Sequence, residues 1–332
     1  MQLLRKIAFP FSLLYALVVY LRNYLFNIGV FSSKSYKTTT VCVGNLSAGG
    51  TGKTPMIELL ISNLQQHYKL AVLSRGYGRK SKGLLIAKNA TTVEELGDEP
   101  YQIYKKYPAI TMVVDGDRRN GIETLEQQIK PDVILLDDAY QHRKVKPTFA
   151  ILLTAYGNLY VDDWYLPTGN LRDAKNEAKR ANVIIVTKCP ATINNEECLK
   201  IEGKLKLKKH QQLLFASLSY AQELKGFTEG LTLTSFKGKK ITLVTGIANP
   251  KPLVDFLNTQ GVDFEHLAYS DHHFFTAAEI ETFASKEFVL TTEKDFVRLK
   301  GKLKNLCYIE VQHKILDKGK DKLLSSINDL IK

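Results

Sequence analysis

The stretch VCVGNLSAGGTGKTP, residues 41–55, decides which fold this sequence predicts. The β-branched run 38–43 is typical of a buried strand, and the apolar spacing over residues 56–64 predicts a helix. A glycine-rich loop between a strand and a helix lets backbone N–H groups surround a polyphosphate, and the helix N-terminus adds partial positive charge. We therefore predict a phosphate-binding loop (P-loop) here.

The residues of this loop have separate expected roles. Lys53 is expected to reach the β- and γ-phosphates of a nucleotide, and the Thr54 hydroxyl to bind Mg²⁺. The generic pattern begins with glycine where this sequence has Ser47, so an ordinary glycine-rich turn is the alternative. The order of strand, Gly-Lys-Thr and helix favours a nucleotide site built from Ser47, Ala48, Gly49, Gly50, Thr51, Gly52, Lys53, Thr54 and Pro55.

Composition sets the broad class of the protein. The 332 residues are enough for two domains, and 44% hydrophobic with 24% charged residues is typical of a soluble globular chain. The net charge of +12 indicates an anionic partner: a nucleotide, a nucleic acid, an acidic lipid or a phosphorylated substrate. The four cysteines form no CxxC pair, which predicts reduced thiols in a cytosolic protein.

Residues 1–35 differ in composition from the rest of the chain. They contain no acidic side chain, and the fifteen residues between Lys6 and Arg22, IAFPFSLLYALVVYL, are uncharged. As a helix they would extend roughly 22 Å against a hydrocarbon core of about 30 Å, which disfavours a transmembrane span. A signal peptide is disfavoured because no small-residue cleavage site follows. We predict an interfacial membrane helix; a helix packed on the protein's own core is the alternative.

Strands alternate with helices through residues 36–225, and each strand is a continuous apolar run. This pattern predicts a doubly wound, mostly parallel α/β sheet of the P-loop NTPase kind. A second, smaller α/β domain is expected over residues 226–332. The predicted strands are 38–43, 70–74, 83–87, 110–114, 133–136, 149–153 and 183–186 in the first domain, and 241–245, 288–290 and 307–311 in the second.

Two aspartates, Asp137 and Asp138, follow the apolar strand 133–136. A carboxylate at the end of a buried strand beside a phosphate loop can hold Mg²⁺ directly or through water. A solvated loop or a helix cap is the alternative. The upstream phosphate loop favours the metal role.

Other polar residues follow predicted strand ends, where an open α/β sheet places its ligands. Asp98 stands at a predicted helix start and could be only a cap. The segment 271–273, Asp-His-His, lacks further metal ligands at suitable spacing and is better interpreted as an acid–base or substrate-orienting element. The candidate substrate-binding arginines are Arg75, Arg79, Arg118 and Arg119.

Nine motifs occur in one order across residues 44–295: GNLSAGGTGKTP, SRGYGR, GDEP, DGDRR, LLDDAYQHR, LPTGNLR, VTK, SDHH and TTEKD. In this combination the sequence resembles the tetraacyldisaccharide 4′-kinase family of lipid A biosynthesis. The resemblance includes the basic, aromatic N-terminal segment, so it covers nearly the whole chain. Ser47 is also the residue that this family shows at the first position of the loop.

The resemblance implies transfer of the γ-phosphate of ATP to the 4′-hydroxyl of tetraacyldisaccharide 1-phosphate, which gives lipid IVA. It implies ATP and Mg²⁺ as cofactors. It also implies a peripheral position on the cytoplasmic face of the bacterial inner membrane, whose lipid surface would be a partner. A substrate phosphate would account for the spare arginines.

The family's functional residues match positions of this sequence. Lys53 and Thr54 match the phosphate and Mg²⁺ ligands. Asp98 matches the aspartate that activates the sugar hydroxyl, and His272 matches the histidine paired with it, so Asp98, His272 and Lys53 are the expected catalytic residues.

The acidic pair also matches, with departures nearby. Asp137 and Asp138 match the family's carboxylates after the strand, but Ala139 replaces the glycine that usually follows them. The family's Arg-Glu-Pro is Arg-Asp-Ala over residues 172–174, which makes a metal-related role for Asp173 less secure.

Two other classes of protein compete with this interpretation. A P-loop GTPase or ATPase of metal or protein delivery would need a base-specifying motif such as NKxD, and residues 186–189, Val-Thr-Lys-Cys, lack its asparagine and aspartate. A nucleic-acid binder is disfavoured because the positive charge is spread along the chain. We therefore expect no nucleic-acid partner.

Overall fold

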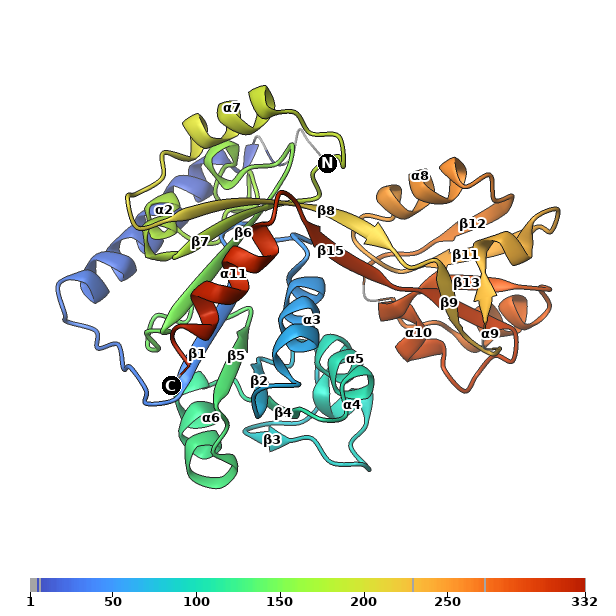
Figure 1. Cartoon of the computed structure of the whole chain (residues 1–332), viewed down its shortest axis with the longest axis horizontal. Helices are drawn as coiled ribbons and strands as arrows, with labels where there is room; N and C mark the ends of the chain where they lie inside the picture. Colours follow the sequence, from blue (N-terminus) through green and yellow to red (C-terminus); the bar gives the residue numbers. More distant parts are fainter. Residues whose placement is uncertain (1–4, 6, 229, 272, 332) are drawn as a thin grey trace.

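The structure is a computed structural model that describes residue 5 and residues 7–331 apart from 229 and 272. The chain forms two α/β bodies that lie side by side, with a nine-stranded sheet in the larger and a six-stranded sheet in the smaller (Figure 1). Helix α2 (Phe9–Asn27) lies on the larger body, on the side away from the smaller one (Figure 1). The predicted α/β class, the second unit and the N-terminal apolar helix are confirmed.

The larger sheet has the strand order β15-β8-β7-β6-β1-β5-β2-β4-β3. Its inner strands pair in parallel, whereas β3 and β15 at the edges pair antiparallel with β4 and β8. Its strands are β1 (Thr39–Asn45), β2 (Leu70–Ser74), β3 (Leu85–Ile86), β4 (Thr111–Val114), β5 (Val133–Asp137), β6 (Phe149–Ala155), β7 (Val183–Thr187), β8 (Gln212–Tyr220) and β15 (Val311–Ile315).

Alternate side chains of the central strands are buried on opposite faces of this sheet. On β1, Val41 and Val43 belong to one core cluster and Cys42 to the other. Parallel strands need crossover helices, which cover both faces and keep the sheet from water. One cluster includes residues of α3 (Lys53–Leu64), α5 (Asp98–Lys106) and α11 (Gly319–Asn328), and the other those of α6 (Arg118–Thr124) and α7 (Asn195–Leu205).

Short helical segments complete the larger body. They are α4 (Val93–Leu96), a π-helical turn (Leu125–Ile129) that extends α6, and the 3-10 turns Tyr160–Asp162 and Lys175–Arg180.

The smaller sheet has the order β10-β9-β14-β13-β11-β12 and its own hydrophobic core. Its strands are β9 (Glu223–Gly226), β10 (Leu231–Thr232), β11 (Ile241–Thr245), β12 (Phe264–Ala268), β13 (Val289–Thr292) and β14 (Leu306–Ile309). Its helices are α8 (Lys251–Thr259), α9 (Ala277–Ala284), α10 (Glu293–Leu299) and the 3-10 turn Leu233–Phe236.

A two-stranded ribbon connects the bodies. Strand β8 leads into β9 of the smaller sheet, and β14 leads back into β15 of the larger one (Figure 1). The Ala221 N–H donates to the Glu310 carbonyl at 3.0 Å between the two pairs of strands. The expected range 226–332 for the smaller domain is therefore corrected. The predicted strand 307–311 is divided at Glu310, so residues after it return to the larger sheet, and α11 packs in the larger body's core.

Helices α5 and α10 run antiparallel across the interface and are joined at both ends by ion pairs. At one end, both the Arg298 Nε and Nη2 of α10 donate to the Asp98 carboxylate of α5. At the other end, Lys106 Nζ lies 3.0 Å from Glu293 Oε2. Each body supplies one helix, so these pairs fix how the bodies meet.

The second of these pairs belongs to a buried charge cluster. Lys106 Nζ also lies 2.7 Å from Glu58 Oε2 of α3 and 3.0 Å from Glu310 Oε1 of the ribbon. We call Lys106, Glu58, Glu293 and Glu310 the Lys106 cluster. Burial, with repulsion from Glu58, raises the pKa of Glu293 to about 7 although Lys106 opposes the rise. One ammonium group thus joins the P-loop helix, the Asp98 helix, α10 and the ribbon.

We expect Lys106→Met to lower the free energy of unfolding by about 3–5 kcal/mol. Three buried carboxylates would lose the cation they share, and among the described residues only Glu310 would keep another, Lys225, at 3.1 Å. Urea unfolding of the whole chain measures the change. Lys251→Met is the matched control, since Lys251 forms an exposed pair with Asp255 at 2.7 Å, and it should change the free energy by less than about 1 kcal/mol. Equal losses in the two variants would contradict a stabilising role for the Lys106 cluster.

Candidate active site

The phosphate loop connects β1 to α3, as predicted. Gly49 and Gly52 have φ angles of 112° and 85°, a backbone region that residues with a Cβ rarely adopt. Within the described residues, the N–H groups of Gly52, Lys53 and Thr54 meet no hydrogen-bond acceptor. Neighbouring N–H donors at a helix N-terminus are suited to bind an anion such as a phosphate group.

Side chains from neighbouring segments hold the loop in this shape. The Asn45 Nδ2 donates to Thr51 Oγ1 at 2.7 Å, and the Thr187 hydroxyl donates to the Thr51 carbonyl at 2.8 Å. The N–H of Ala48 donates to the Asn170 carbonyl at 2.6 Å. The loop is therefore anchored from β1, β7 and the segment before residue 171.

The predicted acidic pair lies beside this loop. Strands β1 and β5 are neighbours in parallel register, with Val43 opposite Asp137, so both strands end at the same edge of the sheet. The Ser74 hydroxyl donates to Asp137 Oδ2 at 2.8 Å, while Oδ1 is buried without a partner in the described part of the chain. Burial, with the Glu99 and Asp138 charges, raises the pKa of Asp137 to about 6. A cation next to Oδ1 would reverse this rise.

Asp138 has different partners. The guanidinium of Arg172 donates to both of its carboxylate oxygens, and Lys53 Nζ lies 3.7 Å from Oδ2. Although burial acts in the opposite direction, Lys53 and Arg172 hold the pKa of Asp138 below its usual value. The pair is thus electrostatically unequal: Asp138 holds cationic side chains, and Asp137 keeps an oxygen for a further ligand.

Asp98 is the first residue of α5, and the charge of its neighbour Glu99 contributes to the raised pKa of Asp137. Its partner Arg298 also donates to the His273 carbonyl at 3.2 Å, so this carbonyl and Asp98 share one guanidinium. His272 itself lies outside the described residues. His273 instead lies 3.0 Å from Glu279 Oε2.

The four predicted arginines occupy different environments. Arg75 follows β2 and is exposed. Arg79 donates to the Gly83 carbonyl of its own loop, and Arg119 pairs with Asp117 at 3.0 Å. Arg118 is buried, donates to the carbonyl of residue 115 at 3.2 Å, and has its pKa lowered by burial although Asp137 opposes the change.

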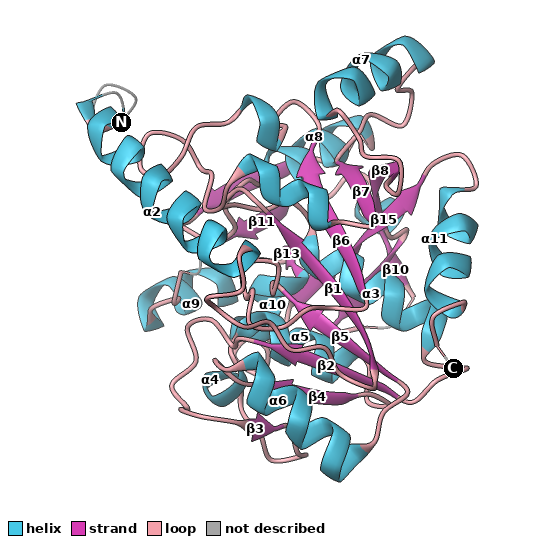
Figure 2. Ribbon diagram, turned by 90° about the vertical axis from the view of Figure 1, so that its left-hand side faces the viewer, coloured by secondary structure: helices cyan, strands magenta, loops and turns pink. Residues whose placement is uncertain are grey.

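Helix α2 runs beside the larger sheet (Figure 2) and is tied to the larger body along its length. The Ser12 hydroxyl donates to Thr168 Oγ1 at 2.8 Å and Tyr15 OH to the Arg172 carbonyl at 3.1 Å. Near the other end, Asn23 Nδ2 donates to Asp173 Oδ1 at 2.7 Å. Asp173, for which a metal-related role was considered, is fully buried and receives this helix instead.

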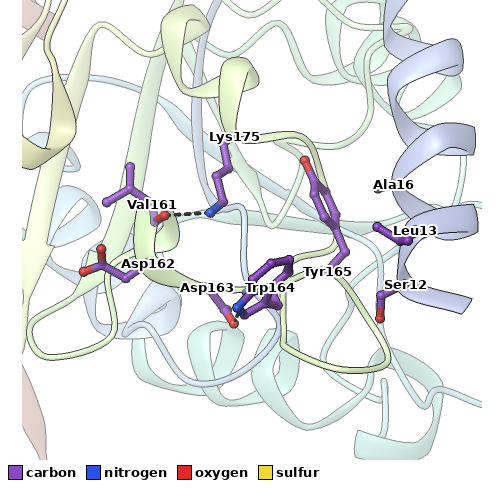
Figure 3. Close-up of a pocket in the computed structure, with 9 residues that line it drawn as sticks. All are labelled: Ser12, Leu13, Ala16, Val161, Asp162, Asp163, Trp164, Tyr165 and Lys175. Carbon is purple, nitrogen blue, oxygen red and sulfur yellow. Dashed lines mark hydrogen bonds between the residues drawn. The ribbon is translucent and has the colours of Figure 1, made fainter. Parts of the chain in front are cut away.

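Two grooves lie beside α2. One has a volume of about 360 Å³, and its walls are α2 and the segment 161–165, with Trp164 and Tyr165 facing the helix (Figure 3). The other has a volume of about 410 Å³ and is lined almost only by apolar atoms; its lining residues include Phe11, Leu14 and Pro167. The outer face of α2 thus continues into an apolar surface of the body.

Sequence reasoning missed four residues at the site. Arg172 was noted only as part of a motif, and Arg298 lies 200 positions from Asp98 in the chain. Lys188 follows β7 with its ammonium close to Gly50, and His313 of β15 contacts Gly52. For Arg172 and Lys188 the signal was their place in the motifs LPTGNLR and VTK, and Lys188 also directly follows β7. For Arg298 and His313 only the fold provides a signal.

Comparison with known proteins shows which family the chain belongs to. A family model described as tetraacyldisaccharide-1-P 4′-kinase matches residues 4–331. The tetraacyldisaccharide 4′-kinase of Flavobacterium johnsoniae is 49% identical over 304 residues, 90% of this chain and 89% of that protein. The protein of the same name from Phocaeicola vulgatus is 44% identical over 310 residues, 89% of this chain and 85% of its own.

A solved structure agrees over the whole chain. LpxK from Aquifex aeolicus in complex with ATP is 28% identical, with a TM-score of 0.78, over 98% of this chain and 99% of that one. The chain therefore belongs to the tetraacyldisaccharide 4′-kinase family, the phosphotransferases of lipid A biosynthesis.

Proposed function

We propose that this chain transfers the γ-phosphate of ATP to the 4′-hydroxyl of tetraacyldisaccharide 1-phosphate and so forms lipid IVA. Its relatives are named for the 4′-kinase activity, and the solved relative binds ATP. The observation that carries the proposal is the meeting of three features at one edge of the larger sheet: the N–H groups of residues 52–54, which have no acceptor among the described residues, the buried Asp137 and the start of α5.

The phosphate loop binds the nucleotide. The N–H groups of residues 52–54 donate to phosphate oxygens, and Lys53 leaves Asp138 to neutralise the β- and γ-phosphates. Thr54 and Asp137 would hold Mg²⁺, which supplies positive charge to the phosphates as the γ-phosphoryl group leaves. The Asp137 oxygen that has no partner in the described part of the chain and the raised pKa of this carboxyl favour this placement. Asp138, already bound by Arg172, would orient Lys53 and contact the metal only through water.

Asp98 is the proposed general base. The 4′-oxygen attacks the γ-phosphorus, the bond from that phosphorus to the β-phosphate oxygen breaks, and the hydroxyl proton passes to the Asp98 carboxylate. Arg298 fixes that carboxylate in place. By analogy with the family, we assign the role of second partner to His272, which lies outside the described residues. The sharing of Arg298 between Asp98 and the segment around residue 273 supports this grouping.

The acceptor carries phosphate and acyl chains, and the surface around the site suits both. Arg75, Arg79, Arg118 and Arg119 supply positive charge near strand ends, and the exposed Arg75 is the best placed for the 1-phosphate. The apolar grooves beside α2 offer surface to the acyl chains.

Helix α2 would hold the enzyme at the cytoplasmic face of the inner membrane. By length and composition its 19 residues could cross a bilayer, but Ser12, Tyr15 and Asn23 bind the body all along the helix, which favours an interfacial position. The sequence before Glu58 contains basic residues and no acidic ones, which suits binding to an acidic lipid surface. The large apolar side chains exposed on α2 are Phe9, Phe11, Leu13, Leu14, Leu17, Val18, Tyr20, Leu21 and Tyr24.

The direct test uses radiolabelled ATP with tetraacyldisaccharide 1-phosphate, followed by thin-layer chromatography. We expect label in the lipid product only when the acceptor is present. Hydrolysis of ATP without labelling of the acceptor would contradict the proposal and favour an ATPase or GTPase.

Lys53→Ala should lower turnover by about 10³-fold, because the transferring group would lose a cation worth about 4 kcal/mol of barrier. Steady-state kinetics in the same assay measure the change in turnover. Lys200→Ala, which removes an exposed lysine paired with Glu196, is the control and should turn over normally. Near-normal turnover of folded Lys53→Ala would exclude this role.

Asp98→Asn should lower kcat by about 10²–10⁴-fold with little change in ATP affinity, because the amide still accepts from Arg298 but cannot take a proton. His272→Ala should have a milder effect. Since the two side chains act as one unit, the double variant should lose less than the product of the single losses. Strictly multiplicative losses would rule out the dyad.

The variant with Leu17→Glu and Leu21→Glu should shift from vesicles of acidic lipid to the soluble fraction, because two charges would enter the apolar face of α2. Sedimentation with such vesicles measures the shift. Leu199→Glu is the control, since Leu199 is a comparably exposed leucine on α7, with 67% of its surface accessible against 64% for Leu17. Unchanged sedimentation of the α2 variant would place the membrane contact elsewhere.

A further inference from the structure

One buried histidine contacts the phosphate loop from a part of the chain that has no assigned role in the reaction. His313 lies on β15, the strand that returns from the smaller body to the edge of the larger sheet. Its Nε2 is 2.9 Å from the Gly52 carbonyl oxygen, across 261 positions of sequence. Strand β15 and helix α3 pack against each other, so the contact belongs to a wider interface.

The contact is close and leaves little room. A Cβ built on Gly52 would lie 2.5 Å from His313 Nε2 and 2.7 Å from its Cε1, so the ring covers the outer side of Gly52. Only 5% of the His313 surface is accessible. The imidazole therefore fills the space behind the loop and prevents water from reaching the Gly52 carbonyl on that side.

The direction of the hydrogen bond follows from its chemistry. A carbonyl oxygen only accepts, so Nε2 must carry the proton and donate it to Gly52. Burial and the nearby Lys188 lower the pKa of His313 to about 4, against the effect of the Gly52 bond itself. At neutral pH the ring is an uncharged donor, and no proton exchange is needed for it to act.

Planarity of the peptide bond connects this carbonyl to the phosphate site. The Gly52 carbonyl and the Lys53 N–H belong to one planar trans unit, so fixing the oxygen fixes the N–H in the opposite direction. The preceding peptide unit is fixed in the same way. Thr187 donates to the Thr51 carbonyl at 2.8 Å and thereby orients the Gly52 N–H. Two consecutive carbonyls are held from outside the loop, and the N–H groups opposite them are those without an acceptor in the described residues.

We propose that His313 is a positioning residue of the phosphate loop, which aims the Lys53 N–H at the phosphates of ATP by donating to the Gly52 carbonyl. It touches neither substrate, and it acts through one peptide unit. The Met56 N–H also donates to the Gly52 carbonyl, at 3.2 Å, as the first turn of α3 requires. His313 supplies the second donor, from the side opposite the helix interior, and so restricts the tilt of the peptide plane.

The test compares two substitutions of equal length. His313→Gln keeps an N–H donor near the position of Nε2, whereas His313→Met has a similar volume and no donor. Loss of one hydrogen bond to the loop predicts a rise in KM for ATP of about tenfold in the Met variant. The Gln variant should recover most of that loss. KM for the lipid acceptor should stay within about twofold in both, since the change is confined to the phosphate loop.

Stability is measured in parallel, because a buried histidine could serve packing alone. Leu323→Ala is the control: Leu323 is a fully buried residue of α11 in the same core cluster as α3, and its truncation should lower the melting temperature without changing KM for ATP. If the Met variant fails to fold, His313→Asn replaces it, because its amide is too short to reach Gly52 and should give the same rise in KM.

The outcomes separate this inference from the proposed function on which it rests. Equal KM values for ATP in the Gln variant and the donor-free variant, or changes that follow melting temperature alone, would overturn the positioning role and leave the kinase assignment intact. A wild-type protein that does not bind ATP would overturn both.

Discussion

The arrangement of the whole chain depends on the antiparallel contact of α5 with α10, which is tied by an ion pair at each end. Each pair joins a carboxylate and a cation from different bodies, and both are largely buried. Buried charges tolerate only arrangements in which they remain paired, so displacement of one body separates opposite charges in a medium of low dielectric constant. The proposed base Asp98 and the Lys106 cluster occupy the two ends of one helix, and the orientation of that base is therefore set by the meeting of the two bodies.

The same contact reaches the phosphate loop by two routes. Through Glu58, the Lys106 cluster holds α3, whose first turn provides the anion site. Through Glu310, it holds the ribbon, and three residues further along that strand His313 contacts Gly52. The phosphate loop and the proposed base are thus built on segments that share one buried cation, the ammonium group of Lys106. Phosphoryl transfer relies mainly on such relative placement, because the protein contributes little covalent chemistry to it.

Local sequence patterns predicted the strands and helices but not the contacts between residues that are far apart in the sequence. Residues 70–74 and 241–245 are strands with the expected bounds, because short apolar or β-branched runs next to glycine-containing turns leave little choice. The glycine-rich loop lies between a strand and a helix and Asp137 at a strand end, as predicted, because motif and strand end coincide. The run 307–311 gave no sign that it would divide between two sheets, since only the neighbouring strands decide it. Arg298 and His313 lack any local signature, because their partners stand 200 and 261 positions away.

The late position of β15 in the chain has a consequence for how the protein is made. The ribosome completes the whole smaller body before it releases residues 311–331, and the Thr39 hydroxyl finally donates to the carbonyl of Leu330, 291 positions later. Until then β8 is an open edge strand, with a row of unpaired backbone groups that could accept a foreign strand. The chain between β8 and β15 contains the whole smaller body, and closing so long a loop is slow. The nascent larger body therefore stays exposed to aggregation and accessible to chaperones for longer than a domain of its size with a continuous chain would.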